Sequence, residues 1–169
     1  MAQTTFSGPV KSLAGFINAG VNTTVSLTAD TSLTVAAHAG KILLCNDADG
    51  KFTLPSIVTT APTDPTSPDQ VNNVGASFFF YIETAATDLD ILTDGTDKFK
   101  GAAMVAVDDG SKKAFFPAAA NDVITLNGST KGGIVGSIVQ VTAIDTASYL
   151  VHNTLLLGSG TIVTPFADA

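Results

Sequence analysis

The chain has 169 residues, of which 45% are hydrophobic and only 14% are charged, whereas charged residues average about 25% in soluble domains. Its net charge of −7 and its lack of arginine argue against nucleic-acid binding, because phosphate recognition depends on clustered lysine and arginine side chains. The longest apolar run, near Phe78–Ile82, is far too short for a membrane span, and Met1–Gly20 lacks the basic start of a signal peptide. We therefore expect a protein made in the cytoplasm, with neither nucleic acid nor membrane as a partner.

The composition favours a β protein. Thr, Val, Ile, Phe and Gly are plentiful, while glutamate, a strong helix former, occurs only at Glu83. The length suits one domain. Because the charge is low and the apolar content high, we expect a subunit that completes its burial in an assembly.

The first 20 residues contain apolar side chains but no sustained period of 2 or 3.6. We interpret residues 1–20 as an extended N-terminal arm that becomes ordered only against a partner. Residues 21–169 then form a single β domain. Its first predicted strands are Val21–Leu27, where polar and apolar residues alternate, and Ser32–Val35.

Two apolar runs, Lys41–Cys45 and Lys51–Leu54, are separated by the short loop Asn46–Gly50, which ends in glycine. This spacing predicts a β-hairpin. A Pro-rich loop follows at residues 59–73, in which Pro62, Pro65 and Pro68 recur every third residue, as in a polyproline II segment. We expect it to be a plain extended loop.

The run Ser77–Ile82 is short and largely aromatic, which predicts a strand buried on both faces. Further strands are predicted at Leu89–Leu92, Ala102–Val107, Ala114–Phe116, Val123–Leu126, Ile134–Thr142, Tyr149–Leu156 and Thr161–Thr164. Turn dipeptides such as Asp94-Gly95 and Asn127-Gly128 lie between them. Regularly spaced short strands predict an all-β fold, an antiparallel β-sandwich or barrel of the jelly-roll-like kind.

The residues that could support catalysis are few. His38 and His152 are the only histidines, Cys45 is the only cysteine, and no nucleophile motif surrounds them. We expect no enzymatic activity and no cofactor. Asp47–Gly50 resembles part of a calcium loop, but the position that requires a bidentate Glu is Ser56, so a hairpin turn is the preferred interpretation.

A second acidic cluster comprises Asp88, Asp90, Asp94 and Asp97. On a strand, Asp88 and Asp90 would share one face, which leaves weak divalent-cation binding at an interface as an open alternative. Asp residues in turns more often bond to their own backbone. We therefore predict no metal site.

Five segments of the sequence resemble small structural proteins of tailed bacteriophages, in particular those that decorate or cement the capsid. The segments are Thr4–Ser12, Gly15–Ile17, the strand, turn and Leu-Pro ending of His38–Pro55, Gly132–Ser137 and the closing Gly158–Phe166. Together they extend over nearly the whole chain.

The resemblance implies a decoration protein on the outside of a virion capsid, made in the cytoplasm of the host. Its partners would be the major capsid protein and further copies of itself, in a homo-oligomer that is often a trimer. The implied capsid or subunit interface combines the arm with the C-terminus: Phe6, Gly8, Pro9, Val10, Phe16, Ile17, Thr164, Pro165 and Phe166.

Two alternatives accompany this interpretation. Phe6 and Phe166 could instead close the ends of their own β domain. The chain could also be a receptor- or carbohydrate-binding β-module of a phage fibre or head appendage, although such modules use aromatic platforms and this chain has no Trp and two Tyr.

Overall fold

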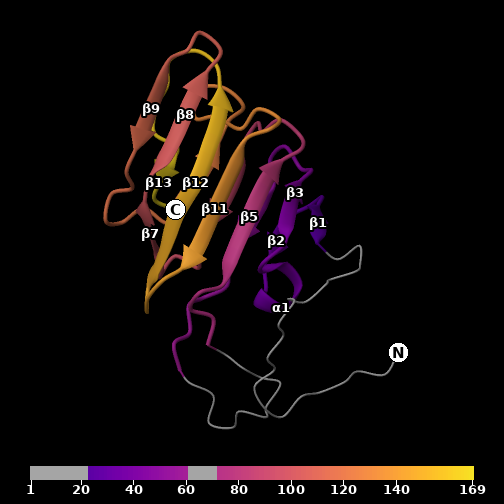
Figure 1. Cartoon of the computed structure of the whole chain (residues 1–169), viewed down its shortest axis with the longest axis vertical. Helices are drawn as coiled ribbons and strands as arrows, with labels where there is room; N and C mark the ends of the chain where they lie inside the picture. Colours follow the sequence, from indigo (N-terminus) through magenta and orange to yellow (C-terminus); the bar gives the residue numbers. More distant parts are fainter. Residues whose placement is uncertain (1–22, 61–71) are drawn as a thin grey trace, which may run out of the picture.

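The computed structural model describes residues 23–60 and 72–169, which form two β-sheets and one short helix, α1 (Val35–His38) (Figure 1). The eight-stranded sheet contains β1 (Thr24–Leu27), β3 (Ile42–Cys45), β5 (Ser77–Ile82), β7 (Lys98–Gly101), β8 (Ala103–Val107), β9 (Lys112–Phe115), β11 (Ile138–Ala143) and β12 (Ser148–Gly158). The five-stranded sheet contains β2 (Thr31–Ser32), β4 (Lys51–Thr53), β6 (Leu89–Leu92), β10 (Val123–Leu126) and β13 (Phe166–Ala167). The expected all-β class is confirmed.

From β1 to β6 the chain alternates between the two sheets. Strands β1, β3 and β5 pair in parallel in one sheet, and β2, β4 and β6 pair in parallel in the other. Parallel neighbours cannot be joined by a tight hairpin, so each connection passes through a strand of the opposite sheet. The result is three stacked coils, each made of one strand from each sheet.

The coils are stacked in register. Leu27 lies opposite Cys45, and Cys45 opposite Ile82, and all three side chains are buried. Stacking continues through the corners, where the backbone N–H of Asn46 donates to Leu27 and that of Asp90 donates to Gly50. The inward-facing positions at the ends of β1, β3 and β5 therefore stack buried apolar side chains on one another.

The expected hairpin between Lys41–Cys45 and Lys51–Leu54 is wrong. Both strands form, but β3 and β4 lie in different sheets, and Asn46–Gly50 is the corner between them. The carbonyl groups of Ala48 and Gly50 accept hydrogen bonds from the next coil, so the loop is held in the stack and does not fold back. This also replaces the interpretation of Asp47–Gly50 as a hairpin turn.

The second half of the chain is mainly antiparallel. Strand β11 pairs antiparallel with β5 and β12, β8 pairs antiparallel with β9, and β10 with β6 and β13. Among the strands of the described residues, six of the eleven pairings are parallel, so the expected antiparallel arrangement is wrong for the coils. Neither sheet closes on itself, which excludes the barrel.

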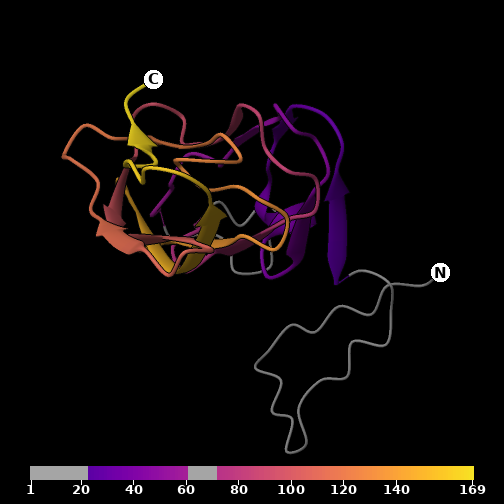
Figure 2. The ribbon, with the colours of Figure 1, turned by 90° about the horizontal axis from the view of Figure 1, so that it is seen from above.

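One hydrophobic core receives side chains from both sheets. Phe52 of β4 and Phe80 of β5 stack with ring centroids 6.4 Å apart, and Tyr149 of β12 and Ile124 of β10 are also fully buried. Seen from above, the two sheets form separate layers (Figure 2). In β3, β5 and β11 the core residues alternate with outward-facing ones, which leaves one face of the eight-stranded sheet on the outside.

Three other strands expected from the sequence differ from the observed ones in their bounds or in their burial. Thr34 caps α1 through its side-chain oxygen, so the helix begins where the expected strand Ser32–Val35 would continue. Only the short strand β2 forms there. The strand expected at Thr161–Thr164 forms later, as β13, and β7 was not predicted. In β5, Phe78 and Phe80 are buried, but Phe79 is only half-buried, so this strand is not buried on both faces.

Candidate interaction surface

The outer face of the eight-stranded sheet carries a row of apolar side chains that crosses five strands. Leu44 of β3 lies opposite Tyr81 of β5, Tyr81 opposite Ile138 of β11, and Ile138 opposite Leu155 of β12. Strand β8 pairs with β12 with Val105 opposite Leu156, so Met104 lies next to Leu155 across the sheet and continues the row on the same face. We call these five residues the apolar row; Leu155 is 39% exposed and Met104 is 42% exposed.

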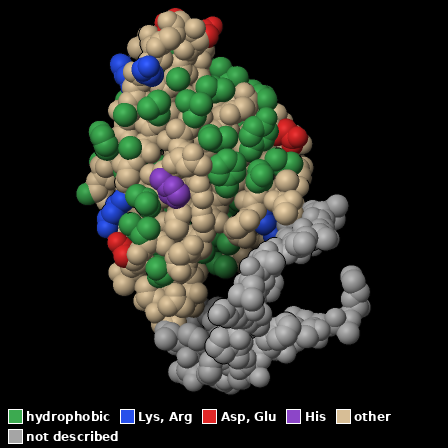
Figure 3. Space-filling view, in the orientation of Figure 1, with side chains coloured by type: hydrophobic (Ala, Val, Ile, Leu, Met, Phe, Trp, Pro, Cys, Tyr) green, Lys and Arg blue, Asp and Glu red, His purple; other side chains and the backbone are tan. Residues whose placement is uncertain are grey.

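This face is also free of charge over a wide area. In the described strands β1, β3, β5, β11, β12 and β8, no Asp, Glu or Lys occupies an outward position. Figure 3 looks onto this face and shows hydrophobic side chains spread across it, with acidic and basic side chains near its margins. Such a surface suits contact with another protein, since charge is depleted at the centre of interfaces.

A group of polar side chains lies beside the apolar row. Gln140 and Thr142 of β11 both donate to the hydroxyl of Ser77, at 2.8 and 3.0 Å. Thr142 Oγ1 also lies 2.8 Å from Nε2 of His152, and Asn153 donates to Gln140. These bonds fix the side chains in place, so the surface is ordered before any partner arrives.

An irregularity of β12 at Asn153 places Leu155 on this face. Asn153 has a positive φ of 48°, a conformation that Asn tolerates better than most residues. At this point the register with β11 shifts by one residue, as in a β-bulge. The bulge turns Leu155 outward, opposite Ile138, although the pattern from Tyr149 to Val151 would have placed it inward.

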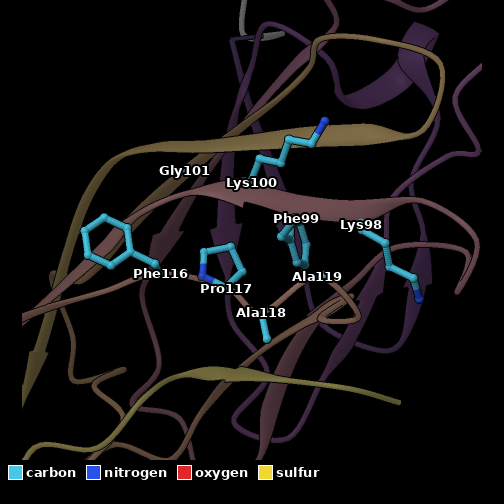
Figure 4. Close-up of a pocket in the computed structure, with 8 residues that line it drawn as sticks. All are labelled: Lys98, Phe99, Lys100, Gly101, Phe116, Pro117, Ala118 and Ala119. Carbon is cyan, nitrogen blue, oxygen red and sulfur yellow. The ribbon is translucent and has the colours of Figure 1, made fainter.

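A shallow hollow of about 420 Å³ opens beside β7. It is lined by Lys98, Phe99, Lys100, Gly101, Phe116, Pro117, Ala118 and Ala119. Phe116 is 74% exposed, and Figure 4 shows its ring at one end of the hollow, with Lys98 at the other. Both lysines that line the hollow are already paired, Lys98 with Asp122 and Lys100 with Asp145.

The interface residues expected from the sequence fall into two groups. Phe6, Gly8, Pro9, Val10, Phe16 and Ile17 lie outside the described residues, as does most of the Pro-rich loop at 59–73. At the C-terminus, Thr164 is exposed, but Pro165 is buried and Phe166 is only 6% exposed. Phe166 belongs to the core of its own domain, where β13 pairs with β10, which corresponds to the alternative in which it closes that domain.

The four clustered aspartates are distributed along the chain from β6 to β7. Asp94 accepts the N–H groups of Thr96 and Asp97 at 2.9 Å, and Asp97 accepts the N–H of Ile57 at 2.8 Å. Burial opposes ionisation of both; it raises the pKa of Asp97, whereas backbone and Ser56 donors hold the pKa of Asp94 below its ordinary value. Asp94 therefore acts as a turn residue, whereas the buried Asp97 ties the segment after β4 to the turn before β7.

Within residues 23–60 and 72–169, no three His, Cys, Asp or Glu side chains are grouped so that they could hold a metal ion. Burial raises the pKa of the Cys45 thiol, so this residue is an inert part of the core. No helix in the same part of the chain is long and apolar enough to cross a membrane.

Comparisons with protein-family models, with curated proteins and with solved structures find no match to this chain. The sequence interpretation did not find the apolar row. Its signal lay in the alternate residues of the aromatic strand, Phe79 and Tyr81, which face away from the core. The remaining members of the row are single residues of other strands, and only the strand order brings them together.

Proposed function

We propose that this protein is a non-enzymatic structural protein of a bacteriophage virion, which binds the outer surface of the capsid and stabilises the shell. The observation that supports this proposal is the uncharged outer face of the eight-stranded sheet with its apolar row. Contiguous exposed apolar patches mark interaction sites on soluble proteins. The sequence resemblance to capsid decoration proteins supplies the kind of partner, the major capsid protein.

The architecture suits this role. We infer that the two sheets act as a β-sandwich, jelly-roll-like in outline, whose five-stranded sheet faces away from the shell. A rigid two-layered domain offers a broad face without needing a cleft, and its hydrogen-bonded side chains lose little freedom on binding. The N-terminal arm, Phe6 to Ile17, is proposed to add contacts along the shell or along a neighbouring copy.

The energetics favour many modest contacts. A specific interface buries roughly 1,200–2,000 Å² in total, and a shell offers the same site many times. Copies of the protein are proposed to associate as homo-oligomers, as trimers, so that several faces bind at once. The net charge of −7 keeps decorated particles from associating with one another.

The decisive test compares virions of the phage that encodes the protein with particles from which it has been deleted. We expect the protein on the purified virion, accessible to antibody from outside, and DNA release at a lower temperature when the protein is absent. Equal release temperatures, or absence of the protein from purified particles, would overturn the proposal.

A matched pair of variants tests the face. Leu155 and Val163 are 39% and 41% exposed, but Leu155 lies in the apolar row and Val163 lies in the segment leading to β13. Leu155→Asp is expected to lower affinity for shells at least tenfold, while Val163→Asp leaves it unchanged, provided that both variants melt like the wild type. Equal effects would place the shell contact elsewhere.

The hollow beside Phe116 favours a second candidate, a receptor- or carbohydrate-binding module of a fibre or head appendage. An exposed aromatic ring at the edge of a hollow is a platform on which a sugar ring can stack. Binding to a glycan array that is lost in Phe116→Ala, in a protein that does not bind shells, would favour this candidate over the capsid proposal.

A further inference from the structure

Among the described residues, the path of paired strands in the eight-stranded sheet ends at β1 on one side and at β9 on the other, while β7 lies off this path beside β12. An edge strand presents unpaired backbone N–H and C=O groups, which readily accept a strand from another chain. The two edges of this sheet are complementary to each other in strand direction, in the residues that face outward and in charge.

The strand directions fit an antiparallel pairing. Strand β1 is parallel to β3 and β5, and two antiparallel steps through β11 make β12 parallel to them as well. Strand β8 is parallel to β12, and β9 is antiparallel to β8. Two copies placed side by side in the same orientation would therefore bring β9 of one antiparallel to β1 of the next.

On each edge strand, alternate residues point their backbone N–H and C=O groups away from the sheet. Carbonyl groups of Thr23 and Leu27 accept hydrogen bonds from the β3 side, so the backbone groups of Thr24 and Ser26 point away from β3. On β9, the bond from Val107 to Ser111 implies that Lys112 and Ala114 point their backbone groups away from β8.

These same residues have their side chains on the outer face of the sheet. Ser26 lies in register with Leu44, and Ala114 lies opposite Met104, which are the two ends of the apolar row. Joining β9 to β1 would thus continue the backbone hydrogen bonds and the outer face from one copy into the next, with Lys112 as the one charged side chain that β9 adds to that face.

Charge is complementary at the same end of the two edges. Lys112 and Lys113 begin β9, next to the turn after β8, while the acidic corners after β1 and β3 carry Asp30, Asp47 and Asp49. Figure 1 shows this turn and these corners at the same end of the sheet, on opposite sides. The ion pairs among the described residues, Lys98–Asp122 and Lys100–Asp145, include none of these five side chains.

We propose that copies of this protein associate head to tail, with β9 of one copy pairing antiparallel to β1 of the next, and with Lys112 and Lys113 facing the acidic corners. This deepens the proposed function, on which it rests only for the premise that copies associate. A head-to-tail contact forms a closed ring if its rotation closes and an open filament if it does not.

The charge contact is tested by exchange of charge, with mass measured by light scattering on the purified full chain in the absence of shells. Lys112→Glu with Lys113→Glu, and separately Asp47→Lys with Asp49→Lys, should each reduce the mass to that of the 17.1 kDa monomer. The variant that combines all four changes should regain the wild-type mass. Lys112→Arg with Lys113→Arg keeps the charge and should not change the mass.

The backbone contact is tested at Ser26. Proline is tolerated on an edge strand where its missing N–H would face outward. Ser26→Pro should therefore keep the wild-type melting curve but yield monomers, while Ser26→Ala stays associated. A monomeric wild type, or unchanged mass in Ser26→Pro and in both charge-reversed variants, would overturn the interface.

These outcomes are separable from those of the capsid proposal. An associated protein that does not bind shells would overturn shell binding and leave this interface standing. A monomer that binds shells would do the opposite. Masses that fall only when residues 2–17 are deleted would show that the arm joins the copies, which would also overturn the edge pairing.

Discussion

Tyr149 connects the two sheets at the level of a single side chain. It is fully buried on β12, and its hydroxyl donates to the carbonyl of Pro55, which follows β4 in the other sheet. Burial raises the pKa of this hydroxyl, so it remains a neutral donor. The ring fills the core while the hydroxyl provides a donor to this carbonyl group.

We expect Tyr149→Phe to lower the free energy of unfolding by about 1–2 kcal/mol, because the Pro55 carbonyl loses its donor. Tyr81→Phe on the outer face should change it by less than about 0.5 kcal/mol. Urea denaturation monitored by circular dichroism measures both. Equal effects of the two substitutions would show that the Tyr149 hydroxyl contributes nothing specific.

Asp122 gives stability a dependence on pH. Burial by itself would raise its pKa, but the Lys98 ammonium at 2.6 Å and the N–H of Ala169 lower the pKa below its ordinary value of 3.8. The unfolded chain then binds the proton more tightly than the folded one. The stabilisation is therefore complete above the ordinary value and is lost as the pH falls through the lower, folded value.

Asp122→Asn should destabilise the protein near neutral pH by roughly 1–2 kcal/mol. The difference from the wild type should shrink as the pH falls below the ordinary carboxyl pKa of 3.8 and through the lower, folded pKa, since the wild-type carboxyl is then protonated as well. Urea titrations at several pH values provide the measurement. A difference that stays constant with pH would contradict the assigned role of the carboxylate.

At the scale of elements, glycines decide how closely the connections approach the strands. Gly132 has a φ of +81°, and a Cβ placed there would lie 2.6 Å from Cβ of Leu156 on β12. Gly110, in the turn between β8 and β9, has a similar φ of +86° but no atom within 4 Å of such a Cβ. The two positions therefore share the conformational requirement and differ in packing.

Gly110→Ala should cost about 1 kcal/mol, the strain of a positive φ alone. Gly132→Ala should cost several times as much, because β12 would also have to shift away from the turn. Thermal denaturation of both variants measures the difference. Similar losses would indicate that the turn before β11 is free to move.

At the scale of the whole molecule, the core of the described part runs from Leu27 to Phe166. Deleting residues 2–17 is therefore expected to leave a cooperatively folded β domain, while lowering its affinity for shells. Calorimetry and cosedimentation with shells measure the two effects. A truncated protein that saturates shells with unchanged affinity would show that the arm is not the anchor.

The pairing between copies and the binding to shells should respond differently to salt. Exposed charges are screened within about 10 Å at 0.1 M salt. Association through Lys112 and Lys113 should thus weaken as salt rises, whereas binding through the apolar row should persist. Light scattering and cosedimentation over the same salt series test this, and a steep loss of shell binding would indicate a contact led by charge.

The sequence by itself determined the all-β class and the position of most strands, because alternation, β-branched residues and turn glycines act locally. It also predicts that the protein completes its burial in an assembly, which stays a prediction. The aromatic strand Ser77–Ile82 was found with the same bounds as β5. Each of these inferences needs only neighbouring residues.

Only the tertiary structure decided which strands pair. Asn46–Gly50 has the composition of a hairpin loop, and the same residues serve equally as a corner between sheets once their carbonyl groups bond to the next coil. The pairing of β3 with β1 and β5, and hence the apolar row, depends on these contacts between distant residues. Local periodicity fixes which way a side chain points from its strand, but it does not specify the sheet to which the strand belongs.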